Sequence, residues 1–290
     1  MKNQTKISVI MSVFNPERKD LFFRAVNSII HQTFTDWELI LYDDGSEKES
    51  ERLIRHVVKL DKRIFYIRNR KNRGLGYALN QCIHFSSGIY IARMDSDDLS
   101  KPDRFKKQYE FLETHLNYQW VGCNAELIDA HGVWGFQKMP KIPKRQDFLF
   151  NSPFVHPSVM FRKDVLVQNG GYLVSKRIMN CEDYELFMRL YKNGARGYNL
   201  QEPLLQYWED YESHKKRTYK RRIREMKVRY HGFRQLGILN STTFYYVLKP
   251  LLVGAIPPPL HHYIRKQTKQ SKRFIRKEVA KNHDTESETV

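Results

Sequence analysis

The apolar run Gly88-Ile89-Tyr90-Ile91-Ala92 leads directly into Arg93-Met94-Asp95-Ser96-Asp97-Asp98, which carries three carboxylates within four residues. The apolar run predicts a buried strand, so the acids lie where the chain leaves the sheet. Open α/β sheets bind ligands at the carboxyl ends of their strands. Three carboxylates there repel one another unless a cation joins them, and hard oxygen ligands suit Mg²⁺ or Mn²⁺. The stretch predicts a divalent metal holding a phosphorylated substrate; a solvated acidic turn is the alternative.

Strands and helices alternate in front of this stretch, with short connections between them. This order predicts a mostly parallel sheet built from right-handed βαβ units, and therefore an α/β fold. Strands are expected at Lys6–Phe14, Trp37–Tyr42, Arg63–Ile67 and Gly88–Ala92, and helices at Leu21–Gln32, Glu47–Leu60 and Gly74–Ser86.

The pattern continues less regularly after the acids. The Gly-, Pro- and Lys-rich segment Asp129–Ser152 is expected to be a loop. Helices are predicted at Pro102–Leu116 and Cys181–Lys192, and strands at Trp120–Ile128 and Ser158–Phe161.

Further polar residues lie at the ends of these elements. Asp43 and Asp44 close the second strand, where they face either a ligand or only a turn. Arg73, before the third helix, is suited to phosphate. The pair Glu182-Asp183 begins a helix, as a general base or as a partner of the helix dipole. His156 is either structural or a neighbour of metal or phosphate.

The positive charge of the chain is concentrated near its C-terminus. The net charge is +18, and residues 213–281 carry +17 of it, with −3 in residues 282–290. We therefore expect a globular domain over residues 1–212, a basic helical appendage over 213–281 and a disordered tail over 282–290.

The three cysteines include no C-x-x-C pair, so neither a disulfide framework nor a zinc site is expected. No secretory signal precedes Asn15, and prolines and a lysine interrupt the longest apolar segment, Phe244–Leu260. We expect a cytoplasmic protein.

The basic appendage has three interpretations. Its helix, Ser213–Leu236, places Tyr219, Ile223, Met226, Tyr230 and Phe233 on one stripe. Basic and apolar faces together favour docking on an anionic membrane, at the inner face of the cell membrane. A helical oligomerisation face is the second interpretation. Nucleic-acid binding is the third interpretation. The positive charge of the appendage permits it, but no nucleic-acid-binding motif supports it, so we do not expect it.

Six segments in this order resemble the inverting glycosyltransferases of family 2, which have the Rossmann-like GT-A fold. The resemblance runs from Ile7 to Leu205 and is closest to bacterial enzymes that make capsule, exopolysaccharide or lipopolysaccharide glycans. The segments are ISVIMSVFNPE, AVNSIIHQTFTDWELILYDDGS, NRGLGYALNQCI, GIYIARMDSDDLSKPDRF, HPSVMFRKDV and CEDYELFMRL.

The resemblance implies roles for individual residues. Asp44 matches the aspartate that hydrogen-bonds the nucleotide base, usually uracil, with Asp43 beside it. Asp95 and Asp97 match a D-x-D pair, which Asp98 extends, and Asp183 matches the catalytic base. One acid of the D-x-D region contacts ribose or sugar, and Asp97 or Asp98 ligates Mn²⁺ or Mg²⁺. Further donor contacts fall on Phe14, Asn15, Glu17, Arg73 and Arg93, and candidate acceptor or phosphate contacts on Glu182 and His156.

The implied reaction moves one sugar from a nucleotide sugar, most often a UDP-sugar, to a saccharide or lipid-linked hydroxyl, with inversion. The chain lacks the Q-x-x-R-W motif of processive synthases, which favours one transfer per acceptor. Two alternatives remain. A nucleotidyltransferase would also use carboxylates and Mg²⁺, and a non-catalytic membrane or nucleic-acid adaptor would keep the fold alone.

Overall fold

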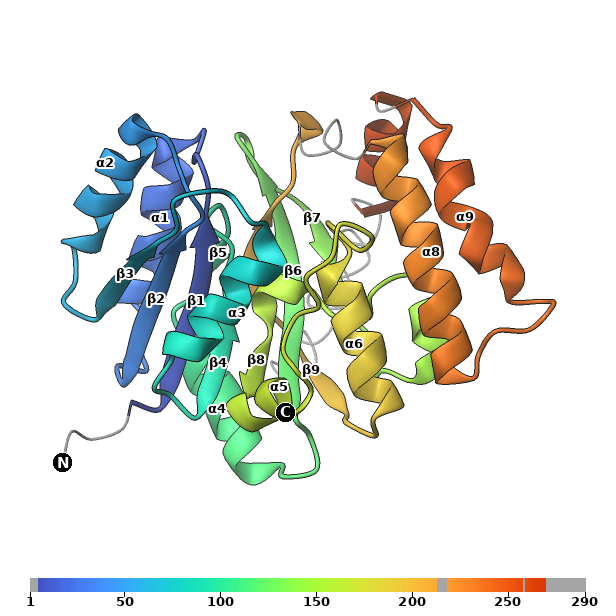
Figure 1. Ribbon diagram of the computed structural model, residues 1–290, viewed down its shortest axis with the longest axis horizontal. Helices are drawn as coiled ribbons and strands as arrows, with labels where there is room; N and C mark the ends of the chain where they lie inside the picture. Colours follow the sequence, from blue (N-terminus) through green and yellow to red (C-terminus); the bar gives the residue numbers. More distant parts are fainter. Residues whose placement is uncertain (1–4, 213–217, 258, 270–290) are drawn as a thin grey trace, which may run out of the picture.

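The computed structural model describes residues 5–212, 218–257 and 259–269 as an α/β fold with one nine-stranded sheet. The strand order is β3-β2-β1-β4-β8-β6-β9-β5, and β7 pairs with β6 outside this path. The predicted α/β class is confirmed. Figure 1 shows helices on both faces of the sheet, with α8 beside α6 and α9 on the far side of α8.

The elements have the following bounds. The strands are β1 (Ile7–Val13), β2 (Trp37–Asp43), β3 (Ile64–Arg68), β4 (Tyr90–Arg93), β5 (Leu99–Ser100), β6 (Trp120–Asp129), β7 (Gly132–Gln137), β8 (Met160–Arg162) and β9 (Gly197–Trp208). The helices are α1 (Lys19–Ile30), α2 (Lys48–Val58), α3 (Leu75–Phe85), α4 (Arg104–Thr114), α5 (Lys163–Gln168), α6 (Glu182–Lys192), α8 (Tyr219–Leu236) and α9 (Phe244–Gly254).

The first four strands form the parallel half of the sheet. β1 lies between β2 and β4, with Val13 opposite Asp43 and Ile10 opposite Arg93. Alternate side chains of β1 enter two separate cores, so Ile10 packs with α3 residues and Val9 with α1 residues. Because all three strands run in the same direction, their carboxyl ends meet at one edge of the sheet.

The second half of the sheet is mixed. β8 is antiparallel to β4 and β6, whereas β6 and β9 are parallel. β9 was not predicted, because Glu202 and Pro203 interrupt its apolar pattern. At the same point the pairing of β6 with β9 shifts register, from Cys123↔Leu200 to Asn124↔Pro203. A proline is tolerated at such an irregularity.

The prediction that Asp129–Ser152 is a loop is wrong over residues 132–137. These residues form β7, which turns back antiparallel on β6 with Asp129 opposite Gly132. Gly132 takes a positive φ of 99°, and the Asp129 carboxylate accepts the His131 N–H at 2.8 Å. A turn closed by Asx and Gly residues makes a hairpin where composition alone suggested a loop.

Of the C-terminal helices, α8 packs on α6 and α9 packs on α8. Val228, Phe233 and Leu236 of α8 are buried in the same core as Phe187. A Cβ on Gly232 would lie 2.2 Å from the Met188 sulfur, so the Met188 side chain fills the space beside this glycine between α8 and α6. The predicted apolar stripe is therefore divided: Phe233 is buried, whereas Tyr219 and Tyr230 remain on the surface.

Within the described ranges, no helix is both long and apolar enough to cross a membrane. The start of the predicted basic helix (213–217), the basic segment 270–281 and the predicted disordered tail (282–290) lie outside the described residues.

Candidate functional site

The predicted acids of the parallel half do meet at one edge of the sheet. Asp43 ends β2, and Asp95, Asp97 and Asp98 follow β4, which lies on the other side of β1. The loop after β1 begins with Phe14 and lies between them. These segments are short and follow buried strands, so the sheet itself fixes their positions.

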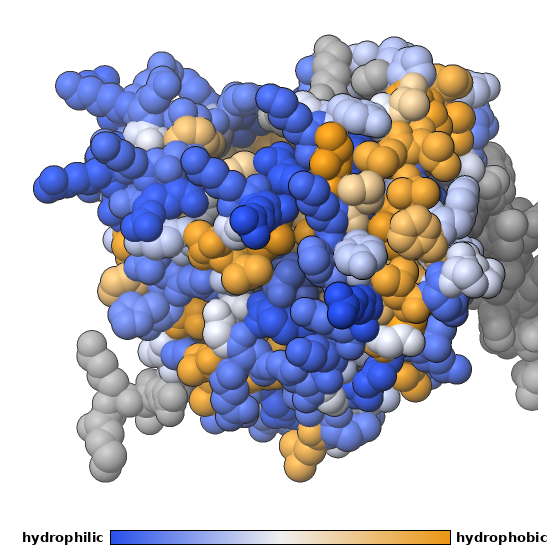
Figure 2. Space-filling model, turned by 45° about the vertical axis from the view of Figure 1, so that its right-hand side comes forward, coloured by the Kyte–Doolittle hydropathy of each residue, from blue (hydrophilic) through white to orange (hydrophobic). Residues whose placement is uncertain are grey.

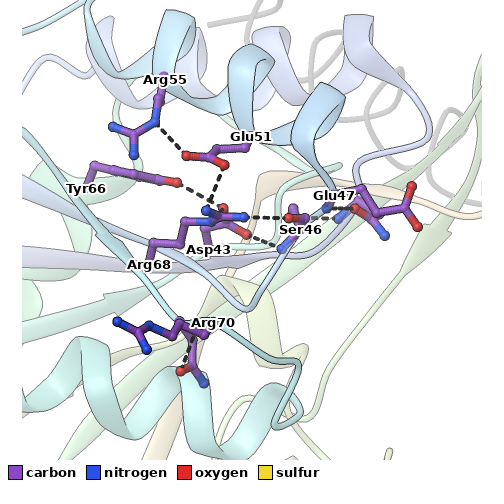
Figure 3. Close-up of polar contacts among 10 residues, drawn as sticks. Asp43, Ser46, Glu47, Glu51, Arg55, Tyr66, Arg68 and Arg70 are labelled. Carbon is purple, nitrogen blue, oxygen red and sulfur yellow. Dashed lines mark hydrogen bonds and ion pairs between the residues drawn. The ribbon is translucent and has the colours of Figure 1, made fainter.

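Asp43 is fully buried, and its carboxylate lies among Ser46, Tyr66 and Arg68 (Figure 3). One carboxylate oxygen accepts the Ser46 N–H at 2.8 Å, and the other accepts the Tyr66 hydroxyl at 2.9 Å. The Arg68 guanidinium lies 3.2 Å from the same oxygen and also pairs with Glu51 at 2.7 Å. The carboxylate thus fixes the turn that follows β2.

Asp44 joins this turn to the loop before α3. Its carboxylate accepts the N–H groups of Arg73 at 3.0 Å and Gly74 at 2.8 Å. Burial raises the pKa of Asp44, although these hydrogen bonds act in the opposite direction. Gly45 has a φ of 85°, and a Cβ there would lie 2.8 Å from the Lys71 carbonyl carbon, so the two loops are in close contact.

Arg73 therefore contributes two different groups. Its backbone N–H holds Asp44, while its guanidinium lies on the Tyr77 ring, 4.0 Å from the ring centre. The side chain is exposed at the edge of the sheet.

The loop after β1 is held in a left-handed conformation. Asn15 has a φ of 41°, and its side-chain oxygen accepts the Glu47 N–H at 2.7 Å. Phe14 stays 48% exposed. Arg18 forms an ion pair with Asp210 and lies over the Trp208 ring, 4.8 Å from its centre.

This loop forms one wall of an open cleft of about 610 Å³. Asp97 and Ser96 line the opposite wall, so the cleft joins the loop after β1 to the acids after β4. The lining residues are Phe14, Asn15, Pro16, Glu17, Arg18, Ser96, Asp97, Trp208, Asp210 and Glu212.

Asp95, Asp97 and Asp98 place one carboxylate oxygen each within 4.8 Å of one another. Asp98 is buried; one of its oxygens accepts the Trp208 N–H at 2.8 Å, and the other has no hydrogen-bond partner. Burial raises its pKa well above the usual range, and the charges of Asp97 and Asp95 add to this. A buried carboxylate oxygen without a donor, beside two further carboxylates, fits a hard divalent cation.

Arg93 is buried below this cluster and forms an ion pair with Asp95 at 2.5 Å. Burial opposes its positive charge, but Asp95 more than offsets this, so the pKa of Arg93 lies above its usual range. Arg93 therefore holds Asp95 from inside the protein and does not reach the cleft as a free side chain.

Asp183 lies on the wall of a second, smaller cavity of about 290 Å³. It stands in the first turn of α6, and burial raises its pKa, while Arg221 and Arg93 lower it. The Glu182 side chain packs against α3. A Cβ built on Gly76, in the first turn of α3, would lie 3.4 Å from the Glu182 Cγ atom. The two neighbouring acids thus have different surroundings.

His156 lines the same cavity and is buried. Its Nε2 atom forms a 2.7 Å hydrogen bond with the Tyr172 hydroxyl. Burial lowers its pKa well below the usual range, and Arg93 acts in the same direction. His156 is therefore a neutral side chain in the wall.

Several residues around both sites were not predicted from the sequence. Trp208 ends β9, which was not predicted at all, and Asp210 follows it. Arg221 and Arg222 line the cavity beside Asp183, but their helix was interpreted from its charge and its apolar stripe. Basic residues are spread around α8, so the sequence gives no signal for which one faces a cavity.

Three comparisons place the chain among known proteins. The family model "Glycosyl transferase family 2" matches residues 8–169. Putative glycosyltransferase EpsE of Bacillus subtilis is 35% identical over 274 residues, which cover 94% of this chain and 98% of the relative. The Escherichia coli UDP-Gal:alpha-D-GlcNAc-diphosphoundecaprenol beta-1,3-galactosyltransferase is 29% identical, with 93% of this chain and 98% of the relative covered.

A solved structure shares the fold at low sequence identity. It is the mannosyltransferase PcManGT of Pyrobaculum calidifontis in complex with GDP-Man and Mn²⁺. Its TM-score is 0.59 at 14% identity, with 92% of this chain and 80% of that chain covered. The similarity indicates the same arrangement of strands and helices.

Proposed function

Since the chain belongs to glycosyltransferase family 2, we propose that it transfers one sugar from a nucleotide-sugar donor to an acceptor hydroxyl with inversion, using a divalent metal. The donor proposed is a UDP-sugar, and the pathway is the synthesis of a bacterial surface polysaccharide. The observation that carries the proposal is the Asp98 oxygen without a hydrogen-bond partner, beside Asp95 and Asp97 and close to an open cleft.

We assign the donor to the cleft of Phe14 and Asp97. Exposed Phe14 offers a stacking surface, and Asn15 and Glu17 offer polar groups beside it. Asp44 holds the Arg73–Gly74 backbone, so we propose that Asp44 and this loop together meet the nucleotide base. Asp43 supports the same turn from inside. The galactosyltransferase relative carries a UDP-sugar in its name, which supports a UDP-sugar here.

We assign the metal to Asp97 and Asp98, with Asp95 held by Arg93 at the same point. The residues fit Mn²⁺ or Mg²⁺, because carboxylate oxygens are the ligands that these ions prefer. When bound, the ion acts as a Lewis acid for the negative charge of a leaving diphosphate. The solved mannosyltransferase contains Mn²⁺ with its nucleotide sugar, which supports a metal of this kind.

We propose Asp183 as the general base. Asp183 lines the cavity beside His156 and Arg221, and a carboxylate there accepts the proton of the acceptor hydroxyl as that oxygen attacks the anomeric carbon. In-line attack forms the new carbon–oxygen bond opposite the one that breaks, so the configuration inverts. Arg221 and Arg93 favour the ionised form of Asp183 that this step requires.

The test is transfer by Asp183→Asn. We expect it to reduce the turnover rate at least about a hundredfold, because loss of a general base costs 10²–10⁴ in rate, and to keep UDP binding. Glu185→Gln is the matched control, since Glu185 lies in the same first turn but pairs with Arg189 at 2.7 Å. Near-normal turnover in Asp183→Asn would refute the assignment.

We also propose that the C-terminal helices dock on an anionic membrane. Tyr245, Leu248 and Leu252 of α9 are 57%, 40% and 57% exposed, at spacings of three and four residues. Figure 2 shows hydrophobic side chains gathered on the part of the surface to which these helices belong. Exposed Lys220, Lys227 and Arg234 lie on neighbouring α8. An amphipathic and basic surface of this kind binds anionic lipid.

Removal of the C-terminal region cannot test membrane docking, because α8 contributes to the core. Leu248→Glu with Leu252→Glu is suitable, since both side chains are exposed. We expect the double variant to lose sedimentation with phosphatidylglycerol vesicles and to keep UDP binding. Glu substitution at exposed Leu116, in the segment after α4, is the control. Equal sedimentation of wild type and double variant would contradict the proposal.

A further inference from the structure

The cavity beside Asp183 has a basic wall. It lies between the first turn of α6, the first turns of α8 and the segment Asn151–Pro157. Among its lining residues, two are acids, Asp183 and Glu225. Four are arginines: Arg221, Arg222, Arg229 and Arg265. The excess of positive charge indicates that the cavity is built for an anionic group.

Two of the arginines are already occupied. Arg229 is buried, pairs with Glu225 at 3.0 Å and donates to the Leu149 carbonyl oxygen at 2.9 Å. Arg265 forms two 2.7 Å contacts with the Glu209 carboxylate. Their donors are directed at protein acceptors, so both arginines serve mainly to hold the wall.

The other two arginines have donors to spare. Arg222 pairs with Glu225 at 3.0 Å through one terminal nitrogen, while its buried Nε has no hydrogen-bond partner. No hydrogen bond or ion pair of the Arg221 side chain is found within the described residues, although it lines the cavity and is close enough to lower the pKa of Asp183. A partly buried guanidinium is favourable only when an anion joins it.

We propose that Arg221, assisted by Arg222, binds the phosphate through which the acceptor sugar is linked to its carrier. Guanidinium groups match phosphate oxygens in geometry and charge. At about 290 Å³ the cavity lies at the lower end of the size range of ligand pockets. It therefore suits one sugar and its phosphate better than a long glycan.

This inference rests on the proposed function, because it takes Asp183 as the base. The acceptor oxygen forms a bond to the donor's anomeric carbon, the bond from that carbon to the diphosphate breaks, and the hydroxyl proton moves to Asp183. The acceptor's own phosphate bond stays intact. Since the phosphate lies across one sugar ring from a ring hydroxyl, Arg221 can fix the distance between that hydroxyl and Asp183.

The test is the binding of farnesyl diphosphate, measured by calorimetry with EDTA present so that the acids of the cleft do not retain phosphate through a metal. We expect Arg221→Ala to weaken binding at least about tenfold, as the loss of a charge-assisted hydrogen bond does. Arg221→Lys should fall between wild type and Arg221→Ala. Lys227→Ala, an exposed position on the same helix, should stay within about twofold of wild type.

Three further measurements separate the sources of the effect. Farnesol binding should be equal in wild type and Arg221→Ala, which assigns the difference to the diphosphate. Phosphatidylglycerol vesicle binding should also be equal; a matching loss there would overturn the proposal in favour of a lipid headgroup. UDP binding with Mn²⁺ should be unchanged in Arg221→Ala, and its loss would likewise overturn it.

The proposed base and the proposed phosphate contact can fail separately. If Asp183→Asn keeps its turnover while Arg221→Ala still loses farnesyl diphosphate, the base assignment is wrong and the phosphate site stands. If wild type and Arg221→Ala bind farnesyl diphosphate equally, the phosphate site is wrong whatever Asp183 does.

Discussion

The cleft of Asp97 and the cavity of Asp183 are built in different ways. The acids of the cleft follow neighbouring parallel strands, so each carboxylate is carried by a short segment directly after a buried strand. The cavity is assembled from α6, α8 and a segment near residue 155, which are far apart in the chain. The first site therefore depends on the sheet and the second on helix packing, and variants should affect them separately.

Removal of the divalent metal should have the largest effect, and it should be limited to the cleft. With EDTA present we expect transfer to stop, because the acids of the cleft would then repel the donor diphosphate. Farnesyl diphosphate should still bind in the cavity. The measurement is transfer activity with EDTA and after addition of Mn²⁺ or Mg²⁺. Undiminished transfer in EDTA would show that the acids serve another purpose.

Asp98→Asn should affect UDP binding, whereas Asp43→Asn should affect the stability of the fold. Asp98→Asn keeps an acceptor for the Trp208 N–H and removes a buried charge, so we expect weaker metal-dependent UDP binding and an unchanged or higher Tm. Asp43→Asn leaves Arg68 without its buried partner, and we expect a loss of about 2 kcal/mol of unfolding free energy. Calorimetry and thermal unfolding of both variants provide the comparison; similar profiles would contradict it.

The change in the pH dependence of transfer when Arg221 is substituted should report on the cavity. Because burial raises the pKa of Asp183, the rate should fall on the acid side at a higher pH than for an exposed aspartate. Arg221→Ala removes a nearby positive charge, so the acid limb should move to higher pH by about one unit. Lys227→Ala should not move it. The measurement is kcat/KM against pH. An acid limb at the same pH in Arg221→Ala and Lys227→Ala would show that Arg221 does not influence the pKa of Asp183.

Substitution of Gly232 should have the smallest effect on chemistry, although it loosens the wall of the cavity. Gly232→Ala places a Cβ against Met188, and overpacking of this kind costs about 1–3 kcal/mol. We expect a lower Tm, weaker farnesyl diphosphate binding and unchanged UDP binding. Gly170→Ala is a control for lost stability away from the cavity: its positive φ of 73° strains a Cβ that meets no atom within 4 Å, so the Tm should fall while both ligands still bind. Equal loss of UDP binding in Gly232→Ala would mean that the two sites are not separate.

The difference between the cleft, which depends on the sheet, and the cavity, which depends on helix packing, explains how much of each could be predicted from the sequence. Local apolar runs and their terminal acids predicted β1, β2 and β4 and brought Asp44, Asp95 and Asp97 to one edge. Periodicity did not predict β9, because Pro203 and a register shift interrupt it. Nor could it predict that Asp43 is buried, since that depends on Tyr66 and Arg68 of another strand.

Most of the cavity could not be predicted from the sequence. The position of Arg221 relative to Asp183 depends on how α8 packs on α6, where the Met188 side chain fills the space beside Gly232. No local pattern around Arg221 contains this information. Glu182 and Asp183 look equivalent in the sequence, yet one packs on α3 and the other lines the cavity.

Trp208, the last residue of β9, and the two residues after it each hold a different part of the molecule. The Trp208 N–H bonds Asp98, the Glu209 carboxylate binds Arg265 of the segment 259–269, and Asp210 pairs with Arg18 of the loop after β1. A shift of this tripeptide would thus be transmitted at once to a metal ligand, to a wall of the cavity and to the donor loop. Any coupling through this tripeptide must be reciprocal, so an acceptor that tightens nucleotide binding would itself be bound more tightly, by the same factor, when the nucleotide is present.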